Sequence, residues 1–452
     1  MPPPPNQFRL LRQRRFAPYF WTQFSGAAND NLFKFAFTVL VTYQLQLSWL
    51  PGSLAGLVIG ALFILPFVLF SATSGQLADK YPHILVIRWV KNLEIAIMVL
   101  AAWGFLAGQV EVLLACTFLM GLHSTVFGPV KFAYLPQVLD ERELTGGNGL
   151  VETGTFVAIL LGNGVGGWLM AWPQLGVPWV ATACLGLAVL GRLAAARIPA
   201  APATSPQLQI QLNPLTETVR NLRLARQDRG VFQALLGISW MWFFGAVFLS
   251  QFPSFAKDVL HGDAQVAALL LVVFSIGIGI GALACERLSR GHVEIGLVPL
   301  GALGMSVFAL DLGWAAHALP VAPPPLMGLT QFMTQPAHWR IMADLLLLSV
   351  SAGLYSVPLY ALIQWRSPAS HRARIIAANN ILNALYMVVS ALLVGALLAL
   401  GLGLPEVFGL LGLANAAVAL QMFLRVPDYL RHCRAWLRAR GTRSRRPPGG
   451  HG

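Results

Sequence analysis

Two opposite charges lie close together in an apolar stretch near the start of the chain. The segment 16–47 reads FAPYFWTQFSGAANDNLFKFAFTVLVTYQLQL, with Asp30, Asn31 and Lys34 at its middle. Asp30 and Lys34 are four residues apart, so on a helix they share a face and can partly neutralise one another. They form either a buried ion pair that fixes helix packing or part of a polar substrate path. We favour the path, because charge inside an apolar span is costly and usually functional.

A second group of polar residues lies between positions 120 and 160. Asn148, Glu152 and Thr155 are spaced by four and three residues and share one helix face. Lys131 precedes them, near the end of another apolar stretch that also holds His123 and Ser124. Glu152 either pairs with a loop arginine or faces a cavity, and the spacing alone does not decide between these. For His123 a packing role is the simpler interpretation, and Lys91 and Glu94 are expected to pair locally.

The second half of the chain offers fewer charges for a substrate. Its candidates are Gln251, Asp344, Asn379, Asn380 and Asn383, which are mostly neutral. We therefore expect the charged part of any substrate to favour the first half.

Four further residues are candidates for gating. Gly75 and Asp79 form a Gly-x-x-x-Asp pattern at the end of an apolar run, and Arg88 follows after a short connection. A carboxylate there can pair with basic residues across a gap between helices and so latch one conformation. Glu286 is the matching acid in the second half. The alternative for Asp79 is an ordinary loop aspartate.

The sequence favours no enzymatic chemistry. It has no G-x-S-x-G elbow, no H-E-x-x-H and no G-x-x-x-x-G-K-[ST] phosphate loop. The four cysteines are widely separated, which argues against a disulfide framework or a Cys-ligated metal. We expect no catalytic residues, no metal and no cofactor.

The elements that must position these residues are membrane-spanning helices. Hydrophobic residues make up 56% of the chain and charged ones 11%, against about 25% charged in soluble domains. A span needs about 20 apolar residues, and runs of that kind recur twelve times. They lie near 17–47, 53–78, 84–107, 110–133, 146–172, 177–197, 231–256, 264–285, 293–318, 340–364, 375–401 and 404–425.

Loop charge predicts the orientation and the division of the chain. Basic residues gather in alternate connections and at both ends, with Lys257 and the border residue Arg340 as exceptions. By the positive-inside rule both termini are cytoplasmic. The net charge of +13 therefore reflects the membrane rather than nucleic acid. We expect a segment 1–16, a six-helix bundle over 17–197, a basic linker over 198–230, a second six-helix bundle over 231–425 and a basic tail over 426–452 near anionic lipid.

Matching loops in the two halves indicate a duplication. Residues 128–167 and 357–395 each read proline, helix end, basic loop, asparagine, polar-faced helix and glycine. Gly75–Asp79 and Ala282–Glu286 correspond in the same way. Internal repeats of this kind are typical of transporter folds.

These features resemble the major facilitator superfamily. The likeness rests on the twelve spans, the central basic linker and GQLADKY at 75–81, although Tyr81–Pro82–His83 departs from the usual Gly-Arg-Lys continuation. Within it, QFSGAANDNLFKFAF (23–37), GPVKFAYLP (128–136) and NGLVETGTFVAILLGNGVGG (148–167) resemble the lysophospholipid transporter family and the transporter half of its acyltransferase fusions. No acyltransferase segment follows, and that family's arginine in the seventh span has no obvious match.

The resemblance implies a flippase that moves lysophosphatidylethanolamine-like lipids to the cytoplasmic leaflet of a bacterial inner membrane for reacylation by a separate acyltransferase. Lys34 or Lys131 would hold the phosphate, and Asp30 or Glu152 the amine. Two alternatives stay open. One is a proton-coupled carrier of another small amphipathic solute or drug, with Asp30 or Glu152 as the proton site. The other is a membrane scaffold or sensor that uses the basic tail.

Overall fold

The chain folds into long helices, as the apolar runs predict. The computed structural model describes residues 6–45, 47, 49–50, 52–172, 174–289, 292–319 and 326–444. Within these residues there is no strand beyond one isolated bridge between Gly262 and Met327. The all-α prediction is confirmed.

Twelve helices in the described part of the chain have 21 residues or more. They are α1 (Ala17–Val39), α2 (Gly52–Lys80), α3 (His83–Ala107), α4 (Val110–Val138), α5 (Glu141–Met170), α6 (Gly176–Ala196), α8 (Arg229–Ser254), α9 (Ala264–Ser289), α10 (Leu297–His317), α12 (Pro336–Arg366), α13 (Arg372–Ala399) and α14 (Leu404–Arg425). Short helical elements are η1 (Gln7–Arg12), η2 (Leu40–Gln44), α7 (Pro214–Arg226), η3 (Phe255–Val259), α11 (Leu329–Thr334), η4 (Ala369–His371) and α15 (Asp428–Ser444).

Ten of the long helices in the described residues have the length and apolar composition of a membrane span. The other two are α1 and α3, which carry the charged residues Asp30, Lys34, Lys91 and Glu94. Because buried partners can satisfy such charges, we keep the count of twelve spans as a prediction.

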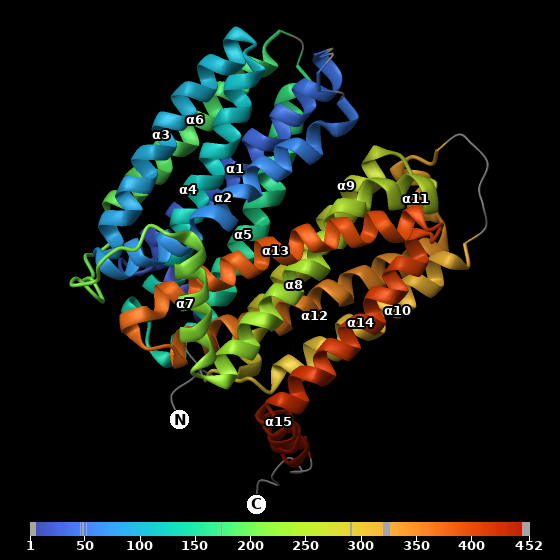
Figure 1. Ribbon diagram of the computed structural model, residues 1–452. Helices are drawn as coiled ribbons and strands as arrows, with labels where there is room; N and C mark the ends of the chain where they lie inside the picture. The colour runs from blue at the N-terminus through green and yellow to red at the C-terminus, as the bar shows by residue number, and fades with distance from the viewer. Residues whose placement is uncertain are drawn as a thin grey trace, which may run out of the picture.

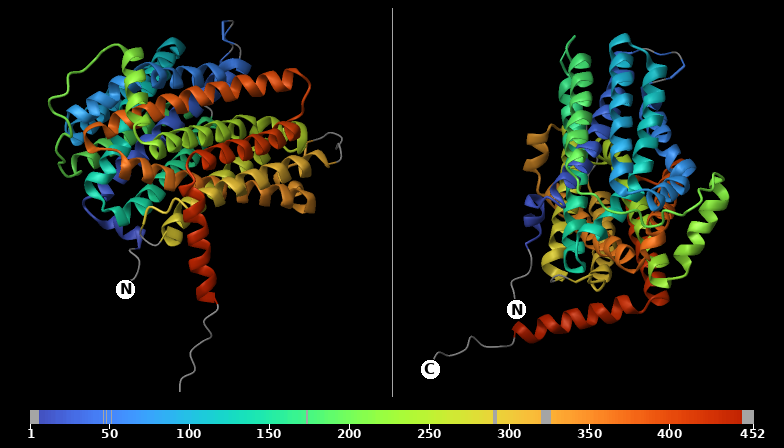
Figure 2. Two further views of the ribbon diagram at one scale, coloured as in Figure 1. Left: turned by 60° about the horizontal axis from the view of Figure 1, so that its bottom comes forward. Right: turned by 90° about the vertical axis from the view of Figure 1, so that its left-hand side faces the viewer.

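Helices α1 to α6 lie beside one another and form the first half, and α8 to α14 form the second (Figure 1). Helix α7 lies in the connection between them. Helix α15, the last described element, lies at one end of the bundle (Figure 1). This end, which also carries the connection 197–228, is called the linker side below. In both views of Figure 2, α15 runs crosswise to the long helices at this end.

Several helices reach further on the linker side than the apolar runs suggested. Helix α4 continues to Val138, α5 begins at Glu141, and α12 ends at Arg366. A capping box fixes the start of α5. The Asp140 carboxylate accepts a hydrogen bond from the Glu143 backbone N–H, and the Glu143 carboxylate accepts one from the Asp140 backbone N–H. Polar residues in these end turns are thus helical, where hydropathy alone predicted loop.

Candidate functional site

Asp30 and Lys34 do not form the ion pair that was one of the two alternatives for these charges. Asp30 is 8% exposed and accepts a hydrogen bond of 2.7 Å from the hydroxyl of Ser124 on α4. The Lys34 ammonium lies instead 3.8 Å from the centroid of the Phe63 ring on α2. A cation over an aromatic face is a favourable contact, so each charge has a partner from another helix. Lys34 and its neighbour Asn31 are only partly buried.

Asn29, Lys91, Glu94 and His123 form a fully buried polar cluster. The Lys91 ammonium is 2.6 Å from the Glu94 carboxylate, which confirms their predicted local pairing. Asn29 donates a hydrogen bond of 2.8 Å to Glu94, and His123 Nε2 lies 3.3 Å from the same carboxylate. All four side chains are at most 2% exposed. The buried Glu94 carboxylate therefore has three polar neighbours on the protein. The packing role expected for His123 agrees with this arrangement.

Lys131 interacts with both remaining acidic candidates. Its ammonium donates a hydrogen bond of 3.0 Å to the Thr155 hydroxyl on α5. It also interacts electrostatically with Glu152 and with Asp30. One carboxylate oxygen of Asp30 and one of Glu152 have no hydrogen-bond partner within the protein. Lys131 on α4 therefore interacts electrostatically with an acidic residue of α1 and one of α5, and both acids keep a free acceptor atom.

The neutral candidates are engaged elsewhere. Asn148 on α5 and Gln364 on α12 exchange two hydrogen bonds, of 2.6 and 2.9 Å, across the two halves. Asn379 donates to the Leu235 carbonyl and lies within hydrogen-bond distance of Ser239 and Asn383, all within the second half. Gln251 hydrogen-bonds only its neighbour Ser250 and is partly exposed near the end of α8. The structure thus does not bring these three to the charged group.

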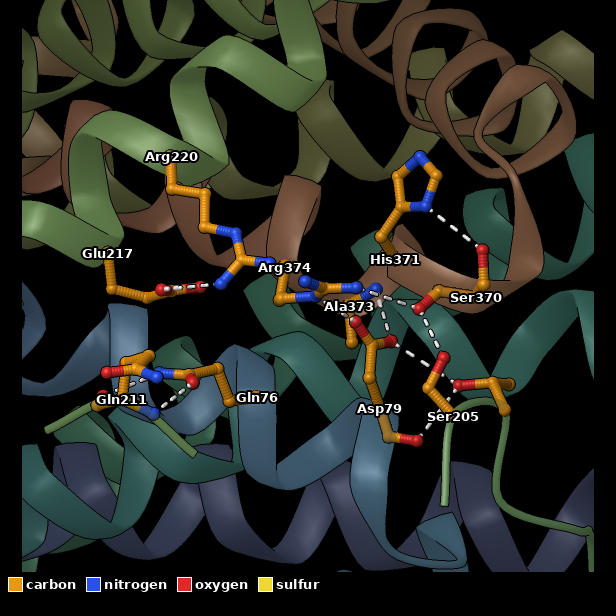
Figure 3. Close-up of polar contacts among 11 residues, drawn as sticks. Gln76, Asp79, Ser205, Gln211, Glu217, Arg220, Ser370, His371, Ala373 and Arg374 are labelled. Atoms are coloured by element: carbon orange, nitrogen blue, oxygen red, sulfur yellow. Dashed lines mark hydrogen bonds and ion pairs between the residues drawn. The ribbon is translucent and has the colours of Figure 1, made fainter. Parts of the chain in front are cut away.

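Asp79 joins the two halves on the linker side (Figure 3). Its carboxylate lies 2.9 Å from the Arg374 guanidinium and accepts a hydrogen bond of 3.1 Å from the Ala373 backbone N–H. Both partners belong to the first turn of α13, where exposed N–H groups favour an anion. Asp79 and Arg374 are 1% and 8% exposed, so the ion pair is buried.

Gly75 permits this approach of α2 to α13. A Cβ atom at Gly75 would lie 2.6 Å from the Ala377 Cβ and 2.9 Å from the Arg374 Cα. Both distances are shorter than van der Waals contact. A larger residue would therefore hold the two helices apart.

Glu286 occupies the corresponding place in the second half but has no cationic partner within the described residues. It ends α9 beside the start of α5, close to Gly146 and Gln7. One of its carboxylate oxygens is buried without a hydrogen bond. Arg88 does not join either contact, because its guanidinium donates to the Ala196 carbonyl at the end of α6.

The connection between α6 and α7 runs over the Asp79 ion pair. We call residues 201–211 the strap. The Ser205 N–H donates to the Asp79 carbonyl at 2.8 Å, and its hydroxyl donates to the Ser370 carbonyl at 2.6 Å (Figure 3). Gln76 and the Gln211 backbone exchange two more hydrogen bonds, of 2.9 and 2.7 Å. The strap therefore contacts α2 in one half and η4 in the other.

Contacts between the halves concentrate on the linker side. Besides Asp79 and Asn148, they include the Phe132 and Tyr360 rings, which stack with centroids 4.4 Å apart. All of these residues lie in the part of their helix nearest this end. The structure thus shows the linker side closed.

Sequence reasoning missed three partners that complete these contacts: Arg374 for Asp79, Gln364 for Asn148 and the strap. Arg374 lies in the basic connection between the predicted spans 340–364 and 375–401. No group of three metal-ligating side chains occurs in the described residues.

Comparison with known proteins identifies the family. The model of the major facilitator superfamily matches residues 19–391. A lysophospholipid transporter LplT from Enterobacter sp. (strain 638) is 27% identical over 76% of this chain and 78% of its own. One from Klebsiella pneumoniae subsp. pneumoniae is 28% identical over 79% and 82%.

Solved structures agree on the fold. A major facilitator transporter, FucP, in the outward conformation has a TM-score of 0.69 at 13% identity, covering 90% of this chain and 98% of its own. A bacterial homologue of the iron transporter ferroportin, in an outward-facing state, has a TM-score of 0.65 at 16% identity, covering 92% and 99%. The chain is a multi-pass membrane transporter, not an enzyme, and it belongs to the major facilitator superfamily.

Proposed function

We propose that this protein transports lysophospholipids, of the lysophosphatidylethanolamine type, across a bacterial inner membrane. The names of its relatives support this class of substrate. The observation that carries the proposal is the charged group of Lys131, Glu152 and Asp30, in which one cation interacts electrostatically with two buried carboxyl groups that each keep a free oxygen.

A zwitterionic headgroup needs partners of both signs. Its phosphate would bind Lys131 or Lys34, and its ammonium would bind the free oxygen of Asp30 or Glu152. Hydrogen bonds to charged groups contribute about 1.5–3 kcal/mol each, and two of them offset part of the cost of moving a headgroup out of water. The acyl chain would remain against the apolar helix faces.

Movement across the membrane would follow from rocking one half against the other. Asp79, Arg374, Gly75 and the strap close the linker side, which we take as cytoplasmic from the positive-inside rule. Opening it would require separating α2 from α13 and lifting the strap. Headgroups captured from the outer leaflet would then reach the inner one, where a separate acyltransferase could reacylate them.

Uptake into proteoliposomes tests the proposal. Purified protein is reconstituted, fluorescent lysophosphatidylethanolamine is added outside, and the fraction protected from external quencher is followed over time. We expect saturable protection above that in empty vesicles, with a smaller protein-dependent increase for an uncharged monoacylglycerol, whose passive crossing is measured in empty vesicles. Uptake equal to that of empty vesicles would remove the proposal.

One observation favours proton coupling as a second candidate. Asp30, Ser124, His123 and Glu94 form a continuous chain of polar groups, with Ser124 Oγ 3.4 Å from His123 Nδ1. Such a chain can conduct protons between a substrate site and a buried acid. Uptake of a different amphipathic solute, driven by an imposed pH gradient while lysophospholipid is excluded, would favour this candidate.

A further inference from the structure

A second site lies on the linker side of the second half, away from the charged group around Lys131. A cavity of about 300 Å³ opens between the start of α8, the end of α12 and the junction of α14 with α15. Ligand pockets begin at about this volume, which suits a headgroup rather than a whole lipid. Its lining includes Arg229, Arg366 and Arg425, each from a different long helix, with Asp228 and Asp428.

The charges around the cavity do not cancel. Asp228 pairs with Arg366 at 2.9 Å and also caps α8 by accepting a hydrogen bond from the Val231 N–H. Asp428 pairs with Arg431 at 3.2 Å. Arg229 and Arg425 form no ion pair with any described residue. The cavity lining therefore holds three arginines and two aspartates, a net charge of +1, and Arg431, outside the lining, neutralises Asp428.

A buried hydroxyl beside the cavity is also unsatisfied. Tyr429 follows Asp428 and is fully buried, yet its hydroxyl has no hydrogen-bond partner within the protein. It interacts electrostatically with Arg366 and Asp228, so it lies close to the wall that these residues form. Tyr429 does not line the cavity, so its hydroxyl lies behind the wall and the arginines carry the argument for a ligand.

We propose that this cavity binds a phosphate group, through the guanidinium groups of Arg229 and Arg425. Guanidinium forms paired hydrogen bonds to phosphate oxygens and loses less hydration than an ammonium group. Two sources share this chemistry: the headgroup of an anionic phospholipid in the adjacent leaflet, and soluble phosphate. Since α15 runs crosswise to the long helices beside the cavity (Figure 2), we take the cavity to lie at the membrane surface. Phosphate bound there would tie α8, α14 and α15 together.

Thermal unfolding with and without ligand tests the site independently of transport. Purified full-length protein, stripped of lipid, is heated while its tryptophan fluorescence is followed. Dihexanoyl phosphatidylglycerol, dihexanoyl phosphatidylcholine or potassium phosphate is added at constant ionic strength. We expect phosphatidylglycerol to raise the midpoint by about 2–5 °C. The control Arg223→Gln/Arg434→Gln, which removes two exposed charges outside the cavity, should keep this rise.

The double variant Arg229→Gln/Arg425→Gln should lose the rise while its ligand-free midpoint stays near that of the wild type. A rise produced equally by potassium phosphate, and lost in the same variant, would support the site with a soluble source. Should the double variant unfold, the exposed single variant Arg425→Glu serves in its place. No rise with either phosphate compound, an equal rise with phosphatidylcholine, or a rise that survives the substitutions would overturn the proposal.

Discussion

The Asp79–Arg374 ion pair gives the sharpest prediction about conformation. It joins α2 to α13, so it can exist only while the linker side is closed. We predict that Asp79→Asn opens this side. The substitution removes the charge with little change in volume, and it leaves Arg374, which is 8% exposed, without its carboxylate.

The size of the effect follows from burial. Removing one partner of a buried ion pair costs about 3–5 kcal/mol. Each 1.4 kcal/mol changes an equilibrium constant by a factor of about ten. The ratio of closed to open protein should therefore decrease by a factor of about one hundred to a few thousand. The amide oxygen introduced by the substitution would still be able to accept the Ala373 N–H, so the lower end of this range is the better expectation.

Distances between two spin labels on the linker side measure this ratio. Arg142 on α5 and Arg287 on α9 are exposed and lie on opposite halves. The four native cysteines are buried, so labels would attach mainly at Arg142→Cys and Arg287→Cys. We expect a longer distance to appear in Asp79→Asn and not in Glu141→Gln, which removes an exposed carboxylate nearby. A distribution identical to that of the unsubstituted labelled protein would refute the role given to the ion pair.

Three further predictions concern the contacts around this ion pair and the buried cluster. Gly75→Val should also lengthen the distance between the spin labels, because the valine side chain would collide with Ala377. Gly60 has open space around it, so Gly60→Val should leave that distance unchanged. Equal effects of the two substitutions would contradict the packing argument. Gln76→Ala removes two hydrogen bonds to Gln211. Trypsin should therefore cleave this variant at Arg220–Arg229 about ten times faster than the wild type. The control Gln207→Ala should be cleaved at the wild-type rate. Glu94→Gln leaves Lys91 and His123 without their shared carboxylate and should destabilise the fold by about 3–5 kcal/mol. The exposed control Glu111→Gln should leave the thermal midpoint unchanged. An unchanged midpoint in Glu94→Gln as well would show that charge does not hold the cluster together.

Much of the fold was predictable from local pattern. The apolar runs identified the helices, because a span of about 20 apolar residues has few other stable structures. The helix ends on the linker side were predicted less well. Residues such as Gln137 and Glu143 look like loop residues by hydropathy, yet they are helical. The contact of Asn148 with Gln364 across the two halves was not predicted.

The candidate site was predicted in part. Residue type and spacing identified Asp30, Lys131 and Glu152, and in the structure Lys131 interacts electrostatically with the other two. The same spacing argument paired Asp30 with Lys34, but Ser124 and Phe63 provide partners from other helices that a single-helix argument does not see. Arg374 lies 295 residues after Asp79, and no local signal links positions that far apart.

The central claim is that charges within the first half recognise a zwitterionic lipid headgroup. The most direct measurement is the initial rate of lysophosphatidylethanolamine uptake by reconstituted Asp30→Ala, Lys34→Ala and Lys131→Gln, at matched amounts of folded protein. Loss of one hydrogen bond to a charged group predicts a decrease of about ten- to a hundredfold, with the Glu111→Gln control unchanged. Wild-type rates in all three variants would contradict the account.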